Sequence, residues 1–149
     1  MNDVSMPAGQ GVTGDEGWKT LPPSPYTDLI GSILVKRRNG VNIYGFRVEE
    51  KHDNSTGRAH GGLIMSFCDE AMGFEAQDPD TNDVFFTVNF ECQLISAARV
   101  GELLEMTVER TEAGRSLVVV RGTCRAGDRV VATCAGLWKR TRKQHAQKD

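Results

Sequence analysis

The sequence has no apolar run that approaches the roughly 20 residues needed for a membrane-spanning helix. It also lacks an excess of either charge, because 18 Lys and Arg residues and 20 Asp and Glu residues leave a formal net charge of −2. This balance gives no electrostatic reason to expect nucleic acid or an anionic membrane as a partner. Met1 to Gly17 contain neither a basic start nor an apolar stretch, so we expect no signal peptide and a cytoplasmic location.

Cysteine is scarce, and its spacing argues against a metal site or a disulfide framework. The four cysteines form no CxxC pair, and none has a histidine at the spacing of metal ligands. Each lies in an apolar stretch, where a free cysteine behaves as a small hydrophobic residue. We therefore expect ordinary core packing for Cys68, Cys92, Cys124 and Cys134.

The length and composition predict one domain between two tails. A chain of 149 residues can bury a sizeable core as one domain. Residues 1–24 are rich in Gly, Pro and small polar side chains, which bury too little apolar surface to become ordered. A short polar segment at 144–149 has the same character. We predict a folded domain over 25–143 and disorder on either side.

Between the tails, the apolar periodicity predicts one helix and six strands. Asn39-Gly40 is a dipeptide typical of a tight hairpin turn, and it separates the first two strands. Short hairpins cannot build a parallel sheet, so the expected fold class is α+β, with one helix against a six-stranded antiparallel sheet. The expected strands are 33–37, 41–49, 84–97, 102–112, 115–126 and 129–140, and the helix runs from about 61 to 77.

The strand expected over 84–97 alternates regularly between apolar and polar side chains, as a half-buried strand does. One face should carry the apolar side chains Val84, Phe86, Val88, Phe90, Cys92 and Leu94. The other face should carry the polar side chains Thr87, Asn89, Glu91 and Gln93.

The helix contains an acid in an apolar position. At about 100° per residue, Met65, Asp69 and Met72 fall on one apolar stripe, while Glu70 falls on the polar side. An ionised carboxylate among methionines is costly unless it has a partner, and a buried acid with a shifted pKa is common at reactive sites. Asp69 is therefore either a catalytic acid or a structural residue that binds neighbouring backbone.

The start of the same helix carries His60-Gly61-Gly62. Backbone N–H groups in a first helical turn have no partner within the helix and carry partial positive charge. Glycine allows a substrate to approach them closely, so Gly61 and Gly62 could polarise a carbonyl or hold an oxyanion. A tight loop before the helix would also explain the glycines, and His60 could be a simple cap.

Asp69 and the helix start cannot belong to one site within a single copy of the chain. Eight or nine residues at about 1.5 Å each place them about 12–14 Å apart. Two helices packed antiparallel about a two-fold axis would bring the acid of one copy to the N–H groups of the other. The sequence therefore suggests a homodimer with two shared sites, and Met65 and Met72 as contact residues.

The spacing Asn54, five residues, His60-Gly61-Gly62, six residues, Asp69 resembles the signature of the PaaI-type hotdog thioesterases. The resemblance extends from about Tyr26 to Arg140. It implies a hotdog fold, in which a sheet wraps one central helix, and assembly into dimers or into tetramers formed by two dimers. It also implies an acyl-CoA substrate, with no metal and no cofactor besides the coenzyme A of the substrate.

The resemblance also implies a role for each residue of the motif. Asp69 matches the catalytic acid, as nucleophile or general base, and Gly61 matches the N–H that polarises the thioester carbonyl. Asn54 matches the side chain that orients water or the acid, and His60 a supporting histidine. Thr87 stands where some relatives have a serine that assists hydrolysis, so its own role is left open.

The remaining substrate contacts are expected from chemistry alone. Arg58 lies beside the motif and could meet the phosphates of coenzyme A, although an exposed arginine is often only solvated. Met72, Phe85 and Phe86 could line an acyl pocket, or simply pack in the core. Other basic candidates for the phosphates are Lys36, Arg37, Lys139, Arg140 and Arg142.

Three other functions compete with thioester hydrolysis. An enoyl-thioester hydratase or dehydratase of the same fold would pair His60 with an acid, but nine positions on one helix turn His60 and Asp69 to opposite sides. A non-catalytic acyl-CoA-binding module would need the pocket and not the acid. A thiol hydrolase using Cys68 with His60 would place the pair too far apart to share a proton within one copy.

Overall fold

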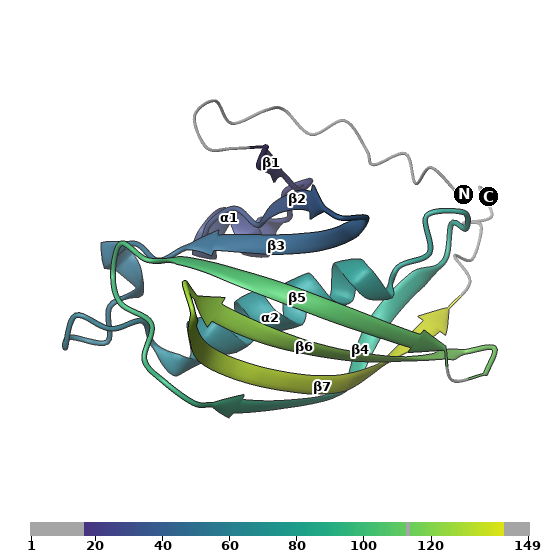
Figure 1. Ribbon diagram of the computed structural model, residues 1–149. Coiled ribbons are helices and arrows are strands. Elements are labelled where there is room, and N and C mark those ends of the chain that lie inside the picture. Colours follow the sequence, from purple (N-terminus) through teal and green to yellow (C-terminus); the bar gives the residue numbers. More distant parts are fainter. Residues whose placement is uncertain (1–16, 113, 142–149) are drawn as a thin grey trace, which may run out of the picture.

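One helix lies across the concave face of an antiparallel sheet in the computed structural model, which describes residues 17–112 and 114–141 (Figure 1). The sheet has seven strands in the order β1-β2-β3-β5-β6-β7-β4, and every pairing is antiparallel. The expected α+β class is therefore confirmed, with one strand more than predicted. The elements are β1 Lys19–Thr20, α1 Pro25–Ile30, β2 Leu34–Arg38, β3 Val41–Arg47, a 3-10 turn Glu50–His52, α2 Gly61–Ala76, β4 Val84–Leu94, β5 Leu103–Glu112, β6 Leu117–Ala126 and β7 Arg129–Thr141.

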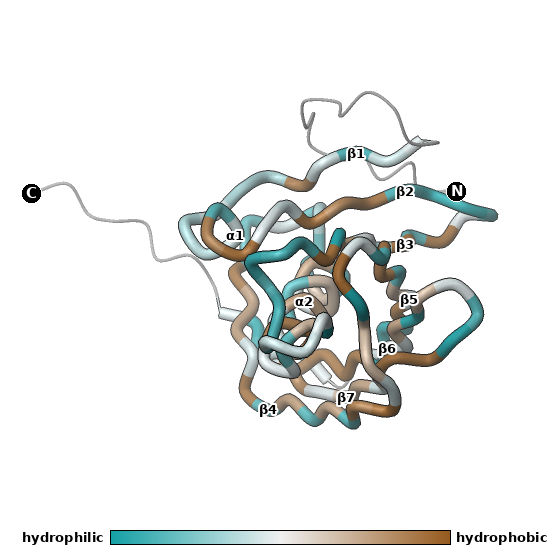
Figure 2. Tube along the Cα trace, turned by 90° about the vertical axis from the view of Figure 1, so that its left-hand side faces the viewer, coloured by the Kyte–Doolittle hydropathy of each residue, from teal (hydrophilic) through white to brown (hydrophobic). Residues whose placement is uncertain are grey.

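The sheet curls around α2, so the helix forms the centre of the core (Figure 2). Phe67 and Ala71 of α2 are completely buried, as are Leu104 and Val120 of the strands opposite. The wrapping accounts for a helix that is apolar over most of its circumference, because strands cover it on several sides. Within the described residues, no helix is long and apolar enough to span a bilayer.

The hairpin between β2 and β3 forms where the sequence predicted it. Asn39 and Gly40 both have positive φ, 50° and 78°, which suits a two-residue turn between antiparallel strands. The turn pairs Arg38 with Val41 and sets the register of the whole hairpin.

The predicted N-terminal tail is wrong in its last third. It was expected to reach Ser24, but β1 pairs with β2, and the Trp18 side chain is only 6% exposed. A Cβ at Gly45 would lie 2.8 Å from the Trp18 ring, so this glycine makes room for the indole. One large aromatic side chain supplies enough buried surface to order a segment whose average composition predicts disorder. Residues 1–16 and 144–149 of the two predicted tails lie outside the described part.

The predicted alternation of β4 is wrong on one side of a β-bulge. The register with β7 shifts between Thr87 and Asn89, and one extra residue reverses which side chains face the core. Phe90 and Cys92 face α2 as expected, but Phe85 packs against the core in place of Phe86, which is 56% exposed. Thr87, expected on the polar face, also turns toward α2.

β4 is the last strand of the sheet, and its outer edge pairs with no other described strand. This strand is 11 residues long and leaves Val84, Phe86 and Val88 between 36% and 56% exposed. Long, apolar, unpaired edges are uncommon in monomers, because another strand can add to them.

The four cysteines lie in the core or pack against it. All four thiols are free, and Cys92 lies opposite Cys134 in the ladder between β4 and β7. Cys68 is 0% exposed, and hydrogen bonding with Cys124 together with burial raises the pKa of its thiol. No three His, Cys, Asp or Glu side chains in residues 17–112 and 114–141 are placed to hold a metal ion.

The central position of α2 can be tested at Phe67. Phe67→Ala should lower the free energy of unfolding by about 3–5 kcal/mol, because the ring is completely buried and its removal leaves a cavity. Urea unfolding followed by circular dichroism measures the change. Leu29→Ala is the control, since Leu29 is 75% exposed and its removal should change stability by less than about 0.5 kcal/mol. Equal effects of the two substitutions would contradict this core.

Candidate active site

Asp69 lies on α2 where the helix meets β4. Its carboxylate Oδ1 accepts a hydrogen bond of 2.9 Å from Thr87 Oγ1. Burial raises the pKa of Asp69 above its ordinary value, and the hydrogen bond from Thr87 opposes part of this rise. The side chain is only half-buried, so Asp69 combines access from outside with a basicity above that of a surface carboxylate.

A small open pocket surrounds this carboxylate. Its volume is about 240 Å³, and it is lined by Met65, Ser66, Asp69, Thr87 and Phe90. Thr87 and Phe90 are three positions apart, so they would face opposite sides of a regular strand, and the bulge brings both to the pocket. Gly136 of β7 allows the bulge, because a Cβ there would lie 2.5 Å from the carbonyl oxygen of Asn89.

Glu70 is a second acid at the same place. The sequence put it on the polar side of the helix, but it is half-buried, and both burial and the charge of Asp69 raise its pKa. The pair concentrates negative charge on this part of α2. Two neighbouring carboxylates oppose each other's ionisation, because the charge of one disfavours the charge of the other.

His60 and Gly62 form the N-terminal cap of α2. Gly62 N–H donates to His60 Nδ1 at 3.1 Å, which places the ring proton of a neutral His60 on Nε2. The expectation that Gly62 could bind substrate through its N–H is therefore not met in this conformation. Gly61 N–H has no hydrogen-bond acceptor among the residues described, and a Cβ at Gly61 would lie 2.8 Å from Leu94 Cδ1. Gly61 is the available donor at this end.

The loop before the helix is held by Asp53, which the sequence reasoning did not single out. Its Oδ1 accepts hydrogen bonds from the backbone N–H groups of Thr56, Gly57 and Arg58, at 2.8 to 3.2 Å. Asn54 Oδ1 accepts from Thr56 N and Thr56 Oγ1, so its own amide donors point elsewhere. An Asp-Asn-Ser-Thr-Gly segment is typical of such side-chain turns, and that signal could have identified Asp53.

His52 also holds the loop before α2 in place, and the sequence analysis did not identify it. It is 7% exposed, and its Nε2 lies 2.5 Å from the carbonyl oxygen of Ile30 in α1. Its Nδ1 accepts from Glu49 N, and its carbonyl oxygen accepts from His60 N at 2.9 Å. A histidine in a polar sequence stretch gives no sign that it is buried, because its partners come from distant backbone.

Tyr26 of α1 reaches the edge of the Asp69 pocket. Ser66 Oγ donates to Gly62 O at 2.9 Å, so the Tyr26 hydroxyl, 2.5 Å from the same Oγ, acts as the donor to it. Ser66 lines the pocket. No sequence signal pointed to Tyr26, because the contact spans 40 positions.

The residues expected to line an acyl pocket do not gather around Asp69 within one copy of the chain. Met72 is completely buried in the core, and Phe86 points outward from β4. Phe85 is partly buried against the core and is absent from the pocket lining. Gly61 and Asp69 are likewise apart, because eight residues of one helix separate them by about 12 Å.

The basic residues considered for coenzyme A differ in their availability. Lys36 binds Glu105 at 3.1 Å, and Arg140 binds Asp83. Arg58 is exposed at the active-site loop, and its backbone pairs with that of Arg99 in an isolated bridge. Arg99 is also exposed, so the bridge places two exposed arginines at neighbouring backbone positions. Arg142 lies outside the described residues.

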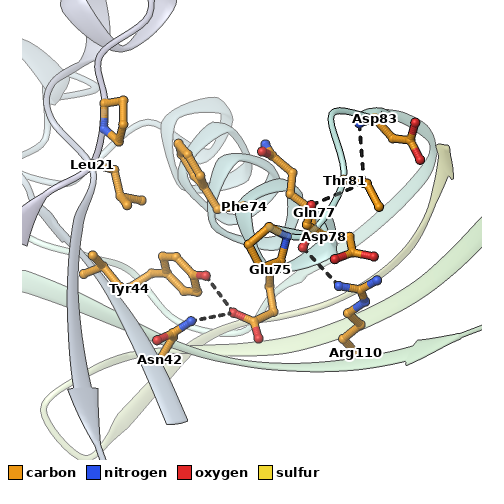
Figure 3. A pocket seen from close by; sticks show the side chains of 13 residues that line it. Leu21, Asn42, Tyr44, Phe74, Glu75, Gln77, Asp78, Thr81, Asp83 and Arg110 are labelled. Atoms are coloured by element: carbon orange, nitrogen blue, oxygen red, sulfur yellow. Dashed lines mark hydrogen bonds between the residues drawn. The ribbon is translucent and has the colours of Figure 1, made fainter. Parts of the chain in front are cut away.

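A larger cavity of about 610 Å³ lies at the other end of α2 and shares no lining residue with the Asp69 pocket (Figure 3). None of the residues expected to be catalytic lines it.

The family model of the thioesterase superfamily matches residues 56–133, more than half of the chain, and this range includes Gly61, Asp69 and Thr87. The chain belongs to the thioesterase superfamily. Its helix wrapped by an antiparallel sheet is the hotdog fold, as the sequence resemblance implied.

Several known proteins resemble this chain over more than half of its length. A Pseudomonas aeruginosa protein whose name proposes an esterase is 29% identical over 126 residues, which cover 83% of this chain and 94% of that protein. Acyl-coenzyme A thioesterase 13 of Homo sapiens is 28% identical over 90 residues, which cover 60% of this chain and 64% of the human one. A Bacillus halodurans protein solved with CoA shares the fold, with a TM-score of 0.65 and 21% identity over 74% of each chain.

The contact between Thr87 and Asp69 can be tested by titration. Thr87→Val removes the hydroxyl and should raise the pKa of Asp69 further, because the lost hydrogen bond favours the charged carboxylate. Carbon-13 NMR of labelled aspartate carboxyl groups measures this pKa. Thr107→Val is the control, since Thr107 is exposed on β5. An unchanged or lowered pKa in Thr87→Val would show that this hydrogen bond does not act on Asp69.

Proposed function

We propose that the protein is an acyl-CoA thioesterase, which hydrolyses the thioester of an acyl- or aryl-CoA to a free acid and coenzyme A. The proposal rests mainly on the half-buried carboxylate of Asp69. Burial raises its pKa, and a hydrogen bond from Thr87 holds it in an open pocket. Such a carboxylate is a stronger base than a solvated one and can still be reached by a substrate. Membership of the thioesterase superfamily supports the choice of a thioester.

The active site in this proposal is shared between two copies of the chain. The unpaired edge of β4 can pair with β4 of a second copy about a two-fold axis, which would extend the sheet and cover Phe86 and Val88. Met65, midway between Gly61 and Asp69, is 39% exposed. A two-fold axis near Met65 would place Gly61 of each copy opposite the partner's Asp69.

Each residue then has one task in hydrolysis. The thioester carbonyl binds Gly61 N–H at the positive end of α2, which stabilises the oxyanion as it forms. Asp69 of the partner either attacks the carbonyl carbon or removes a proton from the attacking water, and the Asn54 amide donors orient that water. In the first route the C–S bond breaks as a mixed anhydride forms on Asp69, and water then cleaves this anhydride to the free acid and the Asp69 carboxylate. In the second route the oxygen of the water forms the new C–O bond, the C–S bond breaks, and Asp69 releases the proton that it took up. In both routes the thiolate of coenzyme A leaves and is protonated in solution. Thr87 orients Asp69 throughout.

The three alternative functions, namely a thiol hydrolase, a hydratase and a non-catalytic binding module, differ from thioester hydrolysis in what they require and what they produce. Cys68 cannot act as a nucleophile in this conformation, because its thiol is completely buried and its pKa is raised. A hydratase would add water to an enoyl-CoA without releasing a thiol, so assays of both products on one substrate panel separate the two reactions. A non-catalytic binding module would show neither product.

The role of Asp69 is tested by its isosteric substitution. Asp69→Asn should lower kcat by about 10²–10⁴-fold, because it removes the base or nucleophile and keeps the side-chain shape. Thiol release from a panel of acyl-CoA esters measures the rate. The variant should stay as stable as wild type or become more stable at pH 7. Burial raises the pKa of Asp69 in the folded state, so its ionisation opposes folding above that pKa. Glu109→Gln, at an exposed position of β5, is the charge-matched control.

The sharing of the site is tested by mixing two inactive variants. Gly61→Pro removes the N–H, and proline suits the first helical position, where His60 before it has an extended ψ of 137°. Its Cβ requires the end of the Leu94 side chain to move, so Gly61→Ala, which adds the same Cβ and keeps the N–H, is the control. A refolded equal mixture of Asp69→Asn and Gly61→Pro should recover roughly a quarter of wild-type activity, since half of the dimers hold one intact site of two. No recovery in mixtures where native mass spectrometry finds mixed dimers would contradict a shared site.

The phosphate contacts are tested at Arg58. Arg58→Ala should raise KM for an acyl-CoA by roughly tenfold and change kcat little, because a charge-assisted hydrogen bond binds ground state and transition state alike. The same variant should leave KM unchanged for the matching acyl-pantetheine, which lacks the nucleotide phosphates. An equal loss on both substrates would mean that Arg58 supports the loop and not the phosphates.

A further inference from the structure

The cavity at the C-terminal end of α2 is walled by segments far apart in the sequence. β3 contributes Asn42 and Tyr44, α2 contributes Phe74 and Glu75, and β5 contributes Arg110 (Figure 3). Its volume of about 610 Å³ is within the range of small-molecule sites. Six positions at 100° each separate Glu75 from Asp69, so the two acids face different sides of α2. The cavity is therefore distinct from the site proposed for hydrolysis.

Glu75 is held in place by two neighbours. Its Oε2 accepts hydrogen bonds from Tyr44 Oη at 2.6 Å and from Asn42 Nδ2 at 3.3 Å. Burial and then the charge of Glu75 raise the pKa of Tyr44, which keeps this phenol protonated and able to donate. The second oxygen, Oε1, accepts no hydrogen bond from any residue in the described part of the chain. A fixed carboxylate with one unused oxygen is a ready acceptor for a ligand donor.

The surroundings of Glu75 contain more acceptors and negative charge than donors. Asn42 Oδ1 is buried and has no hydrogen-bond partner in the described structure. Asp78 and Asp83 also line the cavity, and Asp83 pairs with Arg140 from outside it. Arg110, the one Lys or Arg side chain among the described residues of the lining, donates to the carbonyl oxygen of Gln77 at 3.0 Å. Carboxylates outnumber cations in this lining, so this part of the cavity favours a ligand that brings positive charge and hydrogen-bond donors.

Another part of the lining is apolar and adjoins Tyr44 and Glu75. It consists of Leu21, Pro22, Phe74 and Val35, and Val35 of β2 is the strand partner of Tyr44. Leu21 stands directly after β1, so the segment ordered by Trp18 supplies part of this apolar surface. A ligand that fits both the acidic and the apolar part of the lining needs an apolar body and a cationic head.

We propose that this cavity is a binding site for a primary ammonium ligand with an apolar body. The ammonium group binds the free oxygen of Glu75, and the body packs between Leu21 and Phe74. A primary ammonium has three N–H donors and can therefore satisfy several acceptors at once. The proposal needs neither Asp69 nor the shared site, so it stands or falls independently of the proposed hydrolysis.

The proposal is tested with three probes that differ only in the head group. These are 3-phenylpropylamine, the neutral 3-phenylpropan-1-ol and the anionic 3-phenylpropionate, each titrated into nitrogen-15-labelled full-length protein. The amine should bind at least tenfold more tightly than the alcohol, and the anion should not bind at this cavity. The side-chain amide of Asn42 and the backbone amides of Phe74 and Glu75 should report the binding. Chemical shift changes that gather instead around Met65 and Ser66 would overturn the proposal.

Matched variants separate the charge of Glu75 from the fold. Glu75→Gln should weaken the amine at least tenfold and leave the alcohol unchanged, while Glu109→Gln and Asp69→Asn should bind the amine like wild type. Asp78→Asn, at the edge of the cavity, should weaken the amine by two- to threefold and serves as the second variant if Glu75→Gln does not fold. Equal binding of amine and alcohol to wild type, or full amine affinity in Glu75→Gln, would overturn the site.

Discussion

The bulge in β4 determines how the whole candidate site is built. A regular strand would turn either Thr87 or Phe90 away from α2, whereas the extra residue between Thr87 and Asn89 brings both to the Asp69 pocket. The bulge depends in turn on Gly136, because any side chain there would meet the carbonyl oxygen of Asn89. One missing Cβ on β7 thus sets the contact between Thr87 and Asp69, and with it part of the chemistry of the acid.

The stiffness of α2 explains why the proposed site needs two copies of the chain. A helix holds Gly61 and Asp69 at a nearly fixed separation of about 12 Å, which no loop movement can close. Among the described residues, the Gly61 N–H at one end of this helix has no acceptor, and Asp69 faces β4, whose outer edge pairs with no strand. Pairing two copies of the chain along β4 would cover the apolar outer edge of this strand and would also complete two active sites.

α2 also presents two carboxylates in different surroundings. Asp69 receives one hydroxyl donor and faces an open pocket beside Glu70, a combination that favours proton transfer. Glu75 receives two donors on one oxygen and faces a cavity with an apolar wall, a combination that favours binding. The difference arises from the strands that each helix face meets, since β4 supplies the partner of Asp69 and β3 supplies those of Glu75.

The sequence by itself determined the features that depend on local periodicity and spacing. These include α2, the β2–β3 hairpin at Asn39-Gly40, the α+β class, and Asp69 as an acid out of place on an apolar stripe. Tertiary structure decided the rest, because the relevant contacts join residues distant in sequence. Trp18 orders a segment of disorder-like composition by packing over Gly45, His52 is satisfied by the backbone of α1, and Tyr26 reaches Ser66 across 40 positions. The bulge belongs to the same group, since β4 alternates regularly in sequence and only its pairing with β7 shifts the register.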